Sequence, residues 1–424
     1  MIAGHITNSF GTGMENVAVF YSETAFVLTD EQGLWTLTTE QTITIEPHDT
    51  RYVFSPQRVD VSNGSQSIDF VVRPEFNLTD TQVLSWIEQQ QLANGILESA
   101  ENSNVVSLYD NALAALTFML ADDFFSAEAI FDFFDARIDS ELLQGVGGFS
   151  QFRDRNGTPS NHRWMGDNAW LLIALNNYRA ATGSDRYERM AEELTNWIIS
   201  LQATDGGLLA GYRGDDSVMD FKVTEGNIDA FNAIDGYTRF HESLLNFLAE
   251  QRWDASDGNL IASPDDPNYR YAVDSHSWAY SLFNDYPVNS LHTADRFIVT
   301  HTATATGNNI TGYDIDEDRD TVFLEGTGQM ALAFDLAGLD SEASFYLNEM
   351  EKVLIQSSIH TNAVGFPYSS NRGTGFGTGL LWEGVDTNIA LSGGAWYLFA
   401  KAGFNPFAVG KKDAVPPSDQ FWRD

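Results

Sequence analysis

The chain has 424 residues, of which 43% are apolar, and it carries a formal net charge of −37. These values are typical of a globular protein with one large domain and a smaller one, and they exclude a disordered or fibrous chain. Such a polyanion repels nucleic acids and anionic lipid surfaces, and no apolar run is long enough to span a membrane. The sequence contains no cysteine, which excludes disulfides, thiolate chemistry and cysteine-type zinc sites.

The basic residues are unevenly divided, because only five of the 23 are lysines. An acid-rich, lysine-poor surface suits salty or extracellular surroundings, where ions screen its self-repulsion. No signal peptide is visible in the chain as given. We therefore expect an extracellular or cell-surface location, with an ordinary acidic soluble protein as the alternative.

Residues 1–74 alternate apolar and polar positions in short runs between turn residues, for example Val17–Tyr21, Thr42–Glu46 and Ile68–Val72. A period of two is typical of half-buried strands, so we expect a small all-β sandwich. Its turns and strands follow one another as Gly4–Asn8, Gly13–Val17, Thr29–Gly33 and Tyr52–Pro56. This order resembles the carboxypeptidase-regulatory-like domain. The resemblance implies a non-catalytic module, used for docking or self-assembly.

From residue 75 to about 408 the pattern changes to amphipathic helices. Apolar helices follow an acidic start at intervals of 49 to 61 residues, marked by Asp110, Asp167, Glu225, Asp274, Glu325 and Asp386. Between them lie more highly charged helical segments that begin near residues 79, 125, 185, 240, 289 and 340. This alternation predicts a mostly α fold, an (α/α)6 toroid of six helical hairpins with an inner and an outer ring. Residues 409–424 are expected to form an acidic, polar C-terminal tail.

The lengths of the connections separate the two ends of this ring. Links from inner to outer helices are short, whereas links from outer to inner helices run over roughly 20 to 30 residues and are rich in glycine, asparagine and aromatic residues. Every inner helix therefore starts where a long loop ends. We expect the acidic residues and the long loops to meet at one rim, around a cleft lined by carboxylates.

Three of the acids, Asp167, Glu225 and Glu325, are the candidate catalytic residues. Cleavage of a glycosidic bond needs one carboxylic acid that protonates the leaving oxygen and one carboxylate that activates water or attacks the anomeric carbon. A helix N-terminus keeps a carboxylate ionised, whereas burial against apolar walls keeps it protonated. We expect Glu225 to donate the proton and Asp167 or Glu325 to act as base or nucleophile. Each of them could instead be an ordinary helix cap.

Aromatic and polar side chains near the same helix starts are candidates for sugar binding, because aromatic rings stack on pyranose faces while carboxylates, amides and imidazoles bind hydroxyl groups. The candidate substrate-binding residues are Tyr109, Asp110, Trp164, Asn168, Trp170, Asn227, Asp229, His276, Trp278, Trp382, Glu383 and Asp386. Any single aromatic residue is more often part of a core. For His276, a hydrogen-bonded structural role is an equal alternative.

One acidic run matches part of a calcium-binding loop. Acids stand at positions 1, 3, 5, 7 and 12 of the template, as Asp314, Asp316, Asp318, Asp320 and Glu325. The template requires glycine at position 6, where this chain has arginine. We therefore expect no cofactor, with calcium bound by the first four aspartates as the minor alternative.

The helical part contains the segments Tyr109–Ala112, Trp164–Ala169, Thr224–Ala230, Leu324–Ala333 and Phe404–Phe407. With these segments, residues 80–408 resemble the six-hairpin (α/α)6-toroid glycosidase-like proteins. The resemblance implies carbohydrate chemistry, most often hydrolysis of a polysaccharide or oligosaccharide by acids of the inner helices. Polysaccharide lyases and sugar epimerases are minorities in such folds.

Two functions follow as alternatives. The first is a glycoside hydrolase that uses carboxylate acid and base chemistry on a carbohydrate substrate. A lyase that acts on uronates would need cationic groups at the rim, which an acidic rim does not supply. The second is a non-catalytic glycan-binding, adhesive or self-assembling surface protein on a toroid scaffold. An open groove with facing carboxylates favours the enzyme, and caps fully engaged by backbone amides favour the scaffold.

Overall fold

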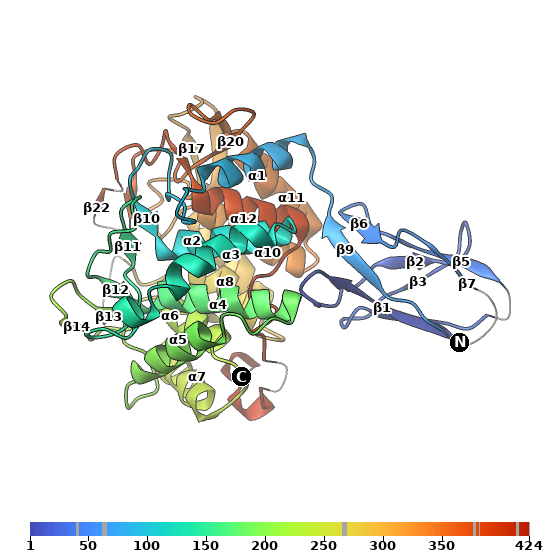
Figure 1. Cartoon of the computed structure of the whole chain (residues 1–424), viewed down its shortest axis with the longest axis horizontal. Helices are drawn as coiled ribbons and strands as arrows, with labels where there is room; N and C mark the ends of the chain where they lie inside the picture. Colours follow the sequence, from blue (N-terminus) through green and yellow to red (C-terminus); the bar gives the residue numbers. More distant parts are fainter. Residues whose placement is uncertain are drawn as a thin grey trace.

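The computed structural model describes residues 1–39, 42–61, 66–264, 269–375, 379–380, 382–412 and 415–423. An N-terminal part built from strands precedes a larger part in which helices form two layers (Figure 1). The two parts have separate hydrophobic clusters. Helices make up 39% of the chain and several small sheets accompany them, so the expectation of a mostly α class is not confirmed.

The strands before residue 75 form two sheets around one apolar cluster. The first sheet has the order β4-β1-β9-β6, with β8 paired to β1, and the second has the order β3-β2-β5-β7. Ile6 and Phe70 from the first sheet and Val19 and Ile45 from the second are buried together. The strands are β1 (Ile2–Asn8), β2 (Ala18–Phe20), β3 (Phe26–Leu28), β4 (Leu34–Leu37), β5 (Ile43–His48), β6 (Tyr52–Ser55), β7 (Val59–Val61), β8 (Gln66–Ser67) and β9 (Phe70–Pro74).

Six helices form a closed inner ring. Each packs against the next along the chain, and the last packs against the first. Nearly every side chain of these helices is buried, as expected for helices that are surrounded by others. The inner helices are α2 (Leu108–Leu120), α4 (Met165–Thr182), α6 (Thr224–Ala233), α8 (Val273–Leu282), α10 (Leu324–Leu336) and α12 (Leu391–Ala402).

A second set of helices covers the ring from outside, and each of them packs against at least one inner helix. Helix α5 shows why: Met190, Leu194 and Trp197 lie on one buried face, while its charged residues face solvent. The outer helices are α1 (Leu78–Gln90), α3 (Phe124–Asp135), α5 (Glu188–Ser200), α7 (Arg239–Gln251), α9 (Asn289–Thr293) and α11 (Asp340–Glu351). They start within three residues of the expected positions. The arrangement is an (α/α)6 toroid in which α1 is the outer partner of α12.

The long loops carry short strands that gather at one end of the toroid. These strands are β10 (Val106–Ser107), β11 (Phe152–Arg153), β12 (Arg163–Trp164), β13 (Gly211–Tyr212), β14 (Val218–Met219), β15 (Trp253–Asp254), β16 (Asn259–Leu260), β17 (Ile298–Thr302), β18 (Asn309–Tyr313), β19 (Ile355–Gln356), β20 (Val364–Pro367), β21 (Thr374–Gly375), β22 (Gly379–Leu380) and β23 (Ile389–Ala390). A π-helical turn spans Ile138–Leu142, and 3-10 turns span Ala294–Phe297, Pro417–Asp419 and Phe421–Arg423. Within the described residues, no helix combines the length and the apolar character needed to cross a lipid bilayer.

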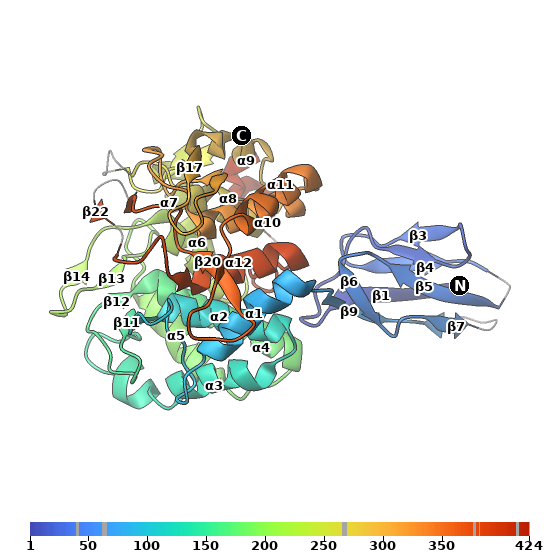
Figure 2. The ribbon, with the colours of Figure 1, turned by 90° about the horizontal axis from the view of Figure 1, so that it is seen from above.

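The N-terminal sheets are attached at the opposite end of the toroid. Tyr52 donates a hydrogen bond of 3.0 Å to the carbonyl of Ala402, the last residue of α12, and Arg51 lies 3.3 Å from Asp335 near the end of α10. Both contacts are made at C-terminal ends of inner helices. Figures 1 and 2 agree that β12, β13, β14 and β22 lie on the far side of the toroid from the N-terminal strands.

The C-terminal segment does not extend as the polar tail that was expected. Trp422 is buried and stacks on Phe283 with ring centroids 4.7 Å apart. The ammonium group of Lys412 is also buried and donates a hydrogen bond of 2.6 Å to the carbonyl of Ile234, just after α6. The described parts of this segment, 409–412 and 415–423, therefore belong to the packed body of the toroid.

Candidate functional site

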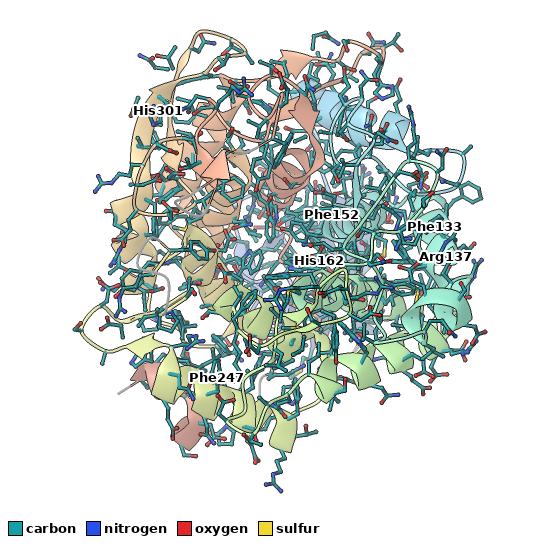
Figure 3. The ribbon with its side chains drawn as sticks, turned by 90° about the vertical axis from the view of Figure 1, so that its left-hand side faces the viewer. Phe133, Arg137, Phe152, His162, Phe247 and His301 are labelled. Atoms are coloured by element: carbon teal, nitrogen blue, oxygen red, sulfur yellow. The ribbon has the colours of Figure 1, made fainter. Side chains whose placement is uncertain are left out.

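A cavity of about 1360 Å³ opens at the end of the toroid where the inner helices begin. Small-molecule sites typically enclose about 300–1,000 Å³, so this cavity is larger than most of them. Figure 3 looks onto this face, with Phe152 of the cavity wall and nearby His162 close to its centre. The long loops form the walls, and the first turns of the inner helices form the floor.

Six carboxyl groups from five inner helices line this cavity. They are Asp110 of α2, Asp167 of α4, Glu225 and Asp229 of α6, Asp274 of α8, and Glu325 of α10. Five of them stand at the second or third residue of their helix, and the sixth, Asp229, lies one turn deeper. The structure thus brings together the three acids predicted as catalytic, along with two that were predicted to bind substrate.

Burial dominates the electrostatics of these groups. It raises the pKa of Asp110 to about 7. Burial, followed by the neighbouring charge of Asp110, raises the pKa of Asp167 to about 8. Of the two environments expected at the helix starts, burial therefore dominates for this pair, because desolvation outweighs the helix dipole. Both carboxyl groups are able to hold a proton at neutral pH.

Burial also favours the protonated form of two further members of the set. Burial raises the pKa of Asp229 well above its usual value, and the charges of Glu225 and Asp167 add to the effect. Burial and the charges of Glu225 and Glu325 do the same to the pKa of Asp274. One buried oxygen of each of Asp229, Asp274 and Glu225 has no hydrogen-bond partner among the described residues. Such oxygens remain available to a ligand that enters the cavity.

Glu225 and Glu325 differ from the aspartates because phenols donate hydrogen bonds to them. Tyr109 donates to Oε1 of Glu325 at 2.6 Å, and Gln329 donates to the same oxygen at 3.1 Å. Tyr269 donates a short hydrogen bond to Oε1 of Glu225. Burial still raises the pKa of both glutamates, but these donors oppose it and favour the ionised form.

Aromatic rings form much of the remaining surface. Trp170 lies deep in the cavity, where its ring contacts Tyr109 and Trp278 at centroid distances of 5.2 and 5.4 Å. Trp164 and Trp382 also line the cavity, and Trp382 is 45% exposed. The ring of Trp382 packs on Tyr368 at 4.4 Å. The predicted aromatic residues therefore all reach the cavity, and Glu383, an exposed residue, lies beside Trp382 on its wall.

The two asparagines predicted to bind substrate do not line the cavity. The side-chain oxygen of Asn168 accepts a hydrogen bond from the backbone of Phe149 at 2.8 Å, and its amide donates to the carbonyls of Phe149 and Trp164 at 3.1 and 2.8 Å. Asn227 binds the backbone of Leu208 in the same way. Both are fully buried, so they fasten the preceding loop to the helix start.

His276 and Asp386 also lie away from the cavity. His276 is fully buried, and its Nδ1 is 3.0 Å from the carbonyl of Ala272. Burial lowers the pKa of His276 to about 4, which keeps it neutral. Asp386 is buried in the loop before α12, which begins only at Leu391. The first turn of α12 instead contributes Ser392 to the cavity.

Asp274, Tyr269 and Tyr368 are among the cavity residues that the predicted site did not include. Asp274 had the same position in its repeat as the chosen acids, so the signal was present and was not used. Tyr269 and Tyr368 come from long loops. No local sequence pattern marks them, because only the folded path of a loop brings its residues back over a helix start.

Comparisons with known proteins were made by sequence and by structure. No family model and no curated protein matches the sequence. Among solved structures, the chain is similar to a glycosidase at a TM-score of 0.53 and 12% identity, over 78% of this chain and 97% of the other. An α-amylase from Clostridium perfringens matches at 0.53 and 10% identity, over 77% and 98%. The cellobiose 2-epimerase from Spirochaeta thermophila DSM 6192 matches at 0.53 and 12% identity, over 77% and 94%.

At these identities the likeness concerns the fold. It agrees with the closed ring of inner and outer helices and establishes the class of architecture, an α-toroid. The resemblance of residues 1–74 to the carboxypeptidase-regulatory-like domain stays a prediction, as does the extracellular location.

Proposed function

We propose that this protein is a carbohydrate-active enzyme, and that it is a glycoside hydrolase. The observation that supports this most directly is the set of six carboxyl groups, five of them on buried residues, in one open, aromatic-walled cavity. Two of them have pKa values of about 7 and 8, while phenols favour the ionised form of two others. Hydrolysis of a glycosidic bond needs this combination of a protonated and an ionised carboxyl group.

The structure favours a division of roles that differs from the one expected. Asp167, with a pKa of about 8, is protonated at neutral pH and is the better proton donor to the leaving glycosidic oxygen. Glu325 is the better base or nucleophile, because Tyr109 and Gln329 donate hydrogen bonds to its carboxylate. The bond from Tyr269 likewise argues against Glu225 as the acid.

In the proposed reaction, the proton of Asp167 passes to the glycosidic oxygen as the bond from that oxygen to the anomeric carbon breaks. Glu325 either removes a proton from the attacking water or bonds to the anomeric carbon before water releases the sugar. In this proposal Glu225, Asp229 and Asp274, which line the cavity, bind sugar hydroxyl groups. The rings of Trp170, Trp278 and Trp382, named above, offer stacking surfaces for the sugar.

The non-catalytic alternative is less well supported. Carboxyl groups that only cap helices would be engaged by backbone amides, whereas Glu225, Asp229 and Asp274 each keep a buried oxygen without a partner among the described residues. The cavity is also open at the rim. An epimerase is a second catalytic candidate, since the pair Asp110 and Asp167 has pKa values near neutrality, which suits the removal and return of a proton.

The test is an assay of sugar release over a panel of polysaccharides and oligosaccharides. Wild type is compared with Asp167→Asn and Glu325→Gln, and with Asp215→Asn, which alters an exposed acid outside the cavity. We expect both cavity variants to lose about 10³-fold or more in kcat, while the control keeps wild-type activity. Equal trace amounts of released sugar from all four proteins would refute the proposal that the protein is a glycoside hydrolase. An epimerised disaccharide without new reducing ends would identify the epimerase instead.

A further inference from the structure

A second acidic cluster lies outside the catalytic cavity, in the loop between β18 and α10. Carboxylate oxygens of Asp314, Asp318 and Asp320 all lie within 4.8 Å of one another. Asp316 stands between them in the sequence. Asp314 and Asp316 are only 1% and 2% exposed. Among the described residues, no lysine, arginine or histidine forms an ion pair with any of the four aspartates.

A second feature of this loop is a buried carboxylate oxygen that no described group satisfies. Oδ2 of Asp316 is buried and has no hydrogen-bond partner among the described residues, while Oδ1 accepts a hydrogen bond of 3.0 Å from the backbone of Asp318. Burial of a carboxylate oxygen without a partner costs free energy, and three nearby carboxylates increase that cost. A bound cation would reduce both the cost of burying this oxygen and the repulsion between the neighbouring carboxylates.

The loop folds in a way that gathers the side chains of Asp314, Asp318 and Asp320, with Asp316 tied to the same turn through its bond to Asp318. Asp314 accepts hydrogen bonds from the backbone of Ile315 at 2.6 Å and of Thr321 at 3.2 Å, so the loop curls around it. Asp318 accepts one from the backbone of Asp320 at 3.2 Å. Each bond uses one direction of a carboxylate oxygen, and each oxygen retains a second lone pair that a metal ion can use.

From this arrangement we infer that residues 314–320 bind a divalent cation, and that the cation is Ca²⁺. The candidate ligands are carboxylate oxygens, which hard cations prefer. Ca²⁺ accepts an irregular set of six to eight oxygens, whereas Mg²⁺ requires near-octahedral geometry, and Zn²⁺ favours nitrogen and sulfur ligands that this loop lacks. Arginine at position 6 of the template is accommodated because Arg319 adopts a left-handed backbone with a φ of 57°.

The cation would connect two loops of the rim. Thr374, in the loop before Trp382, donates a hydrogen bond of 2.9 Å to Asp318 and binds Asp320 through both its backbone and its hydroxyl group. A side chain at Gly373 would collide with Asp320, since its Cβ would stand 2.5 Å from Oδ1. The loop of the aspartates itself leads into α10 and Glu325. Binding of the cation therefore stabilises the two loops at the cavity mouth. This inference does not depend on the reaction proposed above.

The experiment measures thermal unfolding of the full chain after chelation and exchange into metal-free buffer. CaCl2, MgCl2 and NaCl are titrated separately, with NaCl at matched ionic strength because a protein of net charge −37 responds to screening alone. Terbium luminescence, sensitised by nearby aromatic residues, reports binding directly. The variants are Asp318→Asn, at an exposed position of the cluster, and Glu317→Gln, an exposed acid of the same loop that faces Arg296 at 3.6 Å.

We expect CaCl2 to raise the Tm of wild type and of Glu317→Gln by about 2 °C or more with a saturable dependence. In Asp318→Asn, at least tenfold higher concentrations of CaCl2 and of terbium should be needed for the same rise in Tm and the same luminescence. A rise that NaCl or MgCl2 reproduces in full would overturn the inference. So would the absence of any saturable response in wild type, or an unchanged response in Asp318→Asn.

Discussion

The phenol of Tyr109, on α2, donates a hydrogen bond of 2.6 Å to Oε1 of Glu325, on α10. Between these helices in the ring stands α12, and its Trp396 donates a hydrogen bond of 2.9 Å to the oxygen of Tyr109. An indole, a phenol and a carboxylate thus form one chain of hydrogen bonds across three inner helices, with the carboxylate as the final acceptor. This chain stabilises the negative charge of Glu325 inside a cavity where burial opposes it.

Replacement of the phenol should change the pH dependence of the proposed reaction. In Tyr109→Phe the ring remains and the hydrogen bond is lost, so the pKa of Glu325 rises. A bond to a charged group contributes about 1.5–3 kcal/mol, which corresponds to roughly one to two pKa units. The acid limb of the profile of kcat/KM against pH should move to higher pH by about one unit or more. A slower enzyme with an unmoved acid limb would contradict the role of Tyr109.

The shifted aspartates should make stability fall as pH rises. Asp110 and Asp167, with folded-state pKa values of about 7 and 8, stay protonated in the fold at pH values where the unfolded chain has already released those protons. Their contribution to stability is therefore complete below about pH 4, the unfolded value, and is lost as pH rises to about 8. We expect Asp110→Asn to lessen the decline in Tm between pH 5 and pH 8.

The matched control for that experiment is Asp215→Asn. Asp215 is exposed, and hydrogen bonds from Ser217 hold its pKa below the usual range, outside this pH window. Its variant should show the wild-type decline in differential scanning calorimetry. If Asp110→Asn follows the same curve as wild type, the carboxyl group of Asp110 titrates normally in the fold.

Asn168 should matter for stability and not for substrate affinity. Its removal in Asn168→Ala leaves the backbone groups of Phe149 buried and unpaired, at a cost of about 3 kcal/mol in the free energy of unfolding. Urea unfolding measures this cost, with Asn156→Ala in an exposed loop as a control that should stay within about 0.5 kcal/mol of wild type. A raised KM at unchanged stability would restore the substrate-binding role that the sequence suggested.

Trp382 should contribute to binding at the mouth of the cavity. Its ring is partly exposed and is supported from behind by Tyr368. We expect Trp382→Ala to raise KM about tenfold while kcat changes less than twofold, because a stacking contact is made equally in the bound state and the transition state. Trp382→Phe should recover most of the affinity. Steady-state kinetics on an oligosaccharide substrate measures both constants. A loss of kcat at unchanged KM would contradict a binding role for Trp382.

The ring architecture could be predicted from the sequence because it depends on periodic features. Acids recur at the starts of apolar helices, and the alternation of short and long links fixes which ends meet. The predictions failed where the type of a residue does not reveal which way its side chain points. Asn168 follows Asp167 directly, yet one residue around a helix turns a side chain by about 100°, from the cavity to the preceding loop. The sequence shows that both residues are present, but it does not show that their side chains point to different sides of the helix.

The last inner helix shows another limit. Asp386 matched the expected spacing, but the helix begins five residues later, and Ser392 occupies the place of the acid. Loop residues such as Tyr269 could not be found at all, since their approach to Glu225 depends on the complete path of a long loop. Protonation states were equally hidden, because desolvation is a property of the assembled cavity.

The attachment of the N-terminal sheets beneath the C-terminal ends of α10 and α12 has a geometric consequence. Helix α12 has 12 residues and is therefore about 18 Å long, so the whole thickness of the toroid separates this junction from the first turns that carry the acids. If the chain is tethered to a larger body by residues 1–74, its opening points outward from that body. Long polymers can then reach the opening of the cavity without colliding with the body to which the protein is tethered.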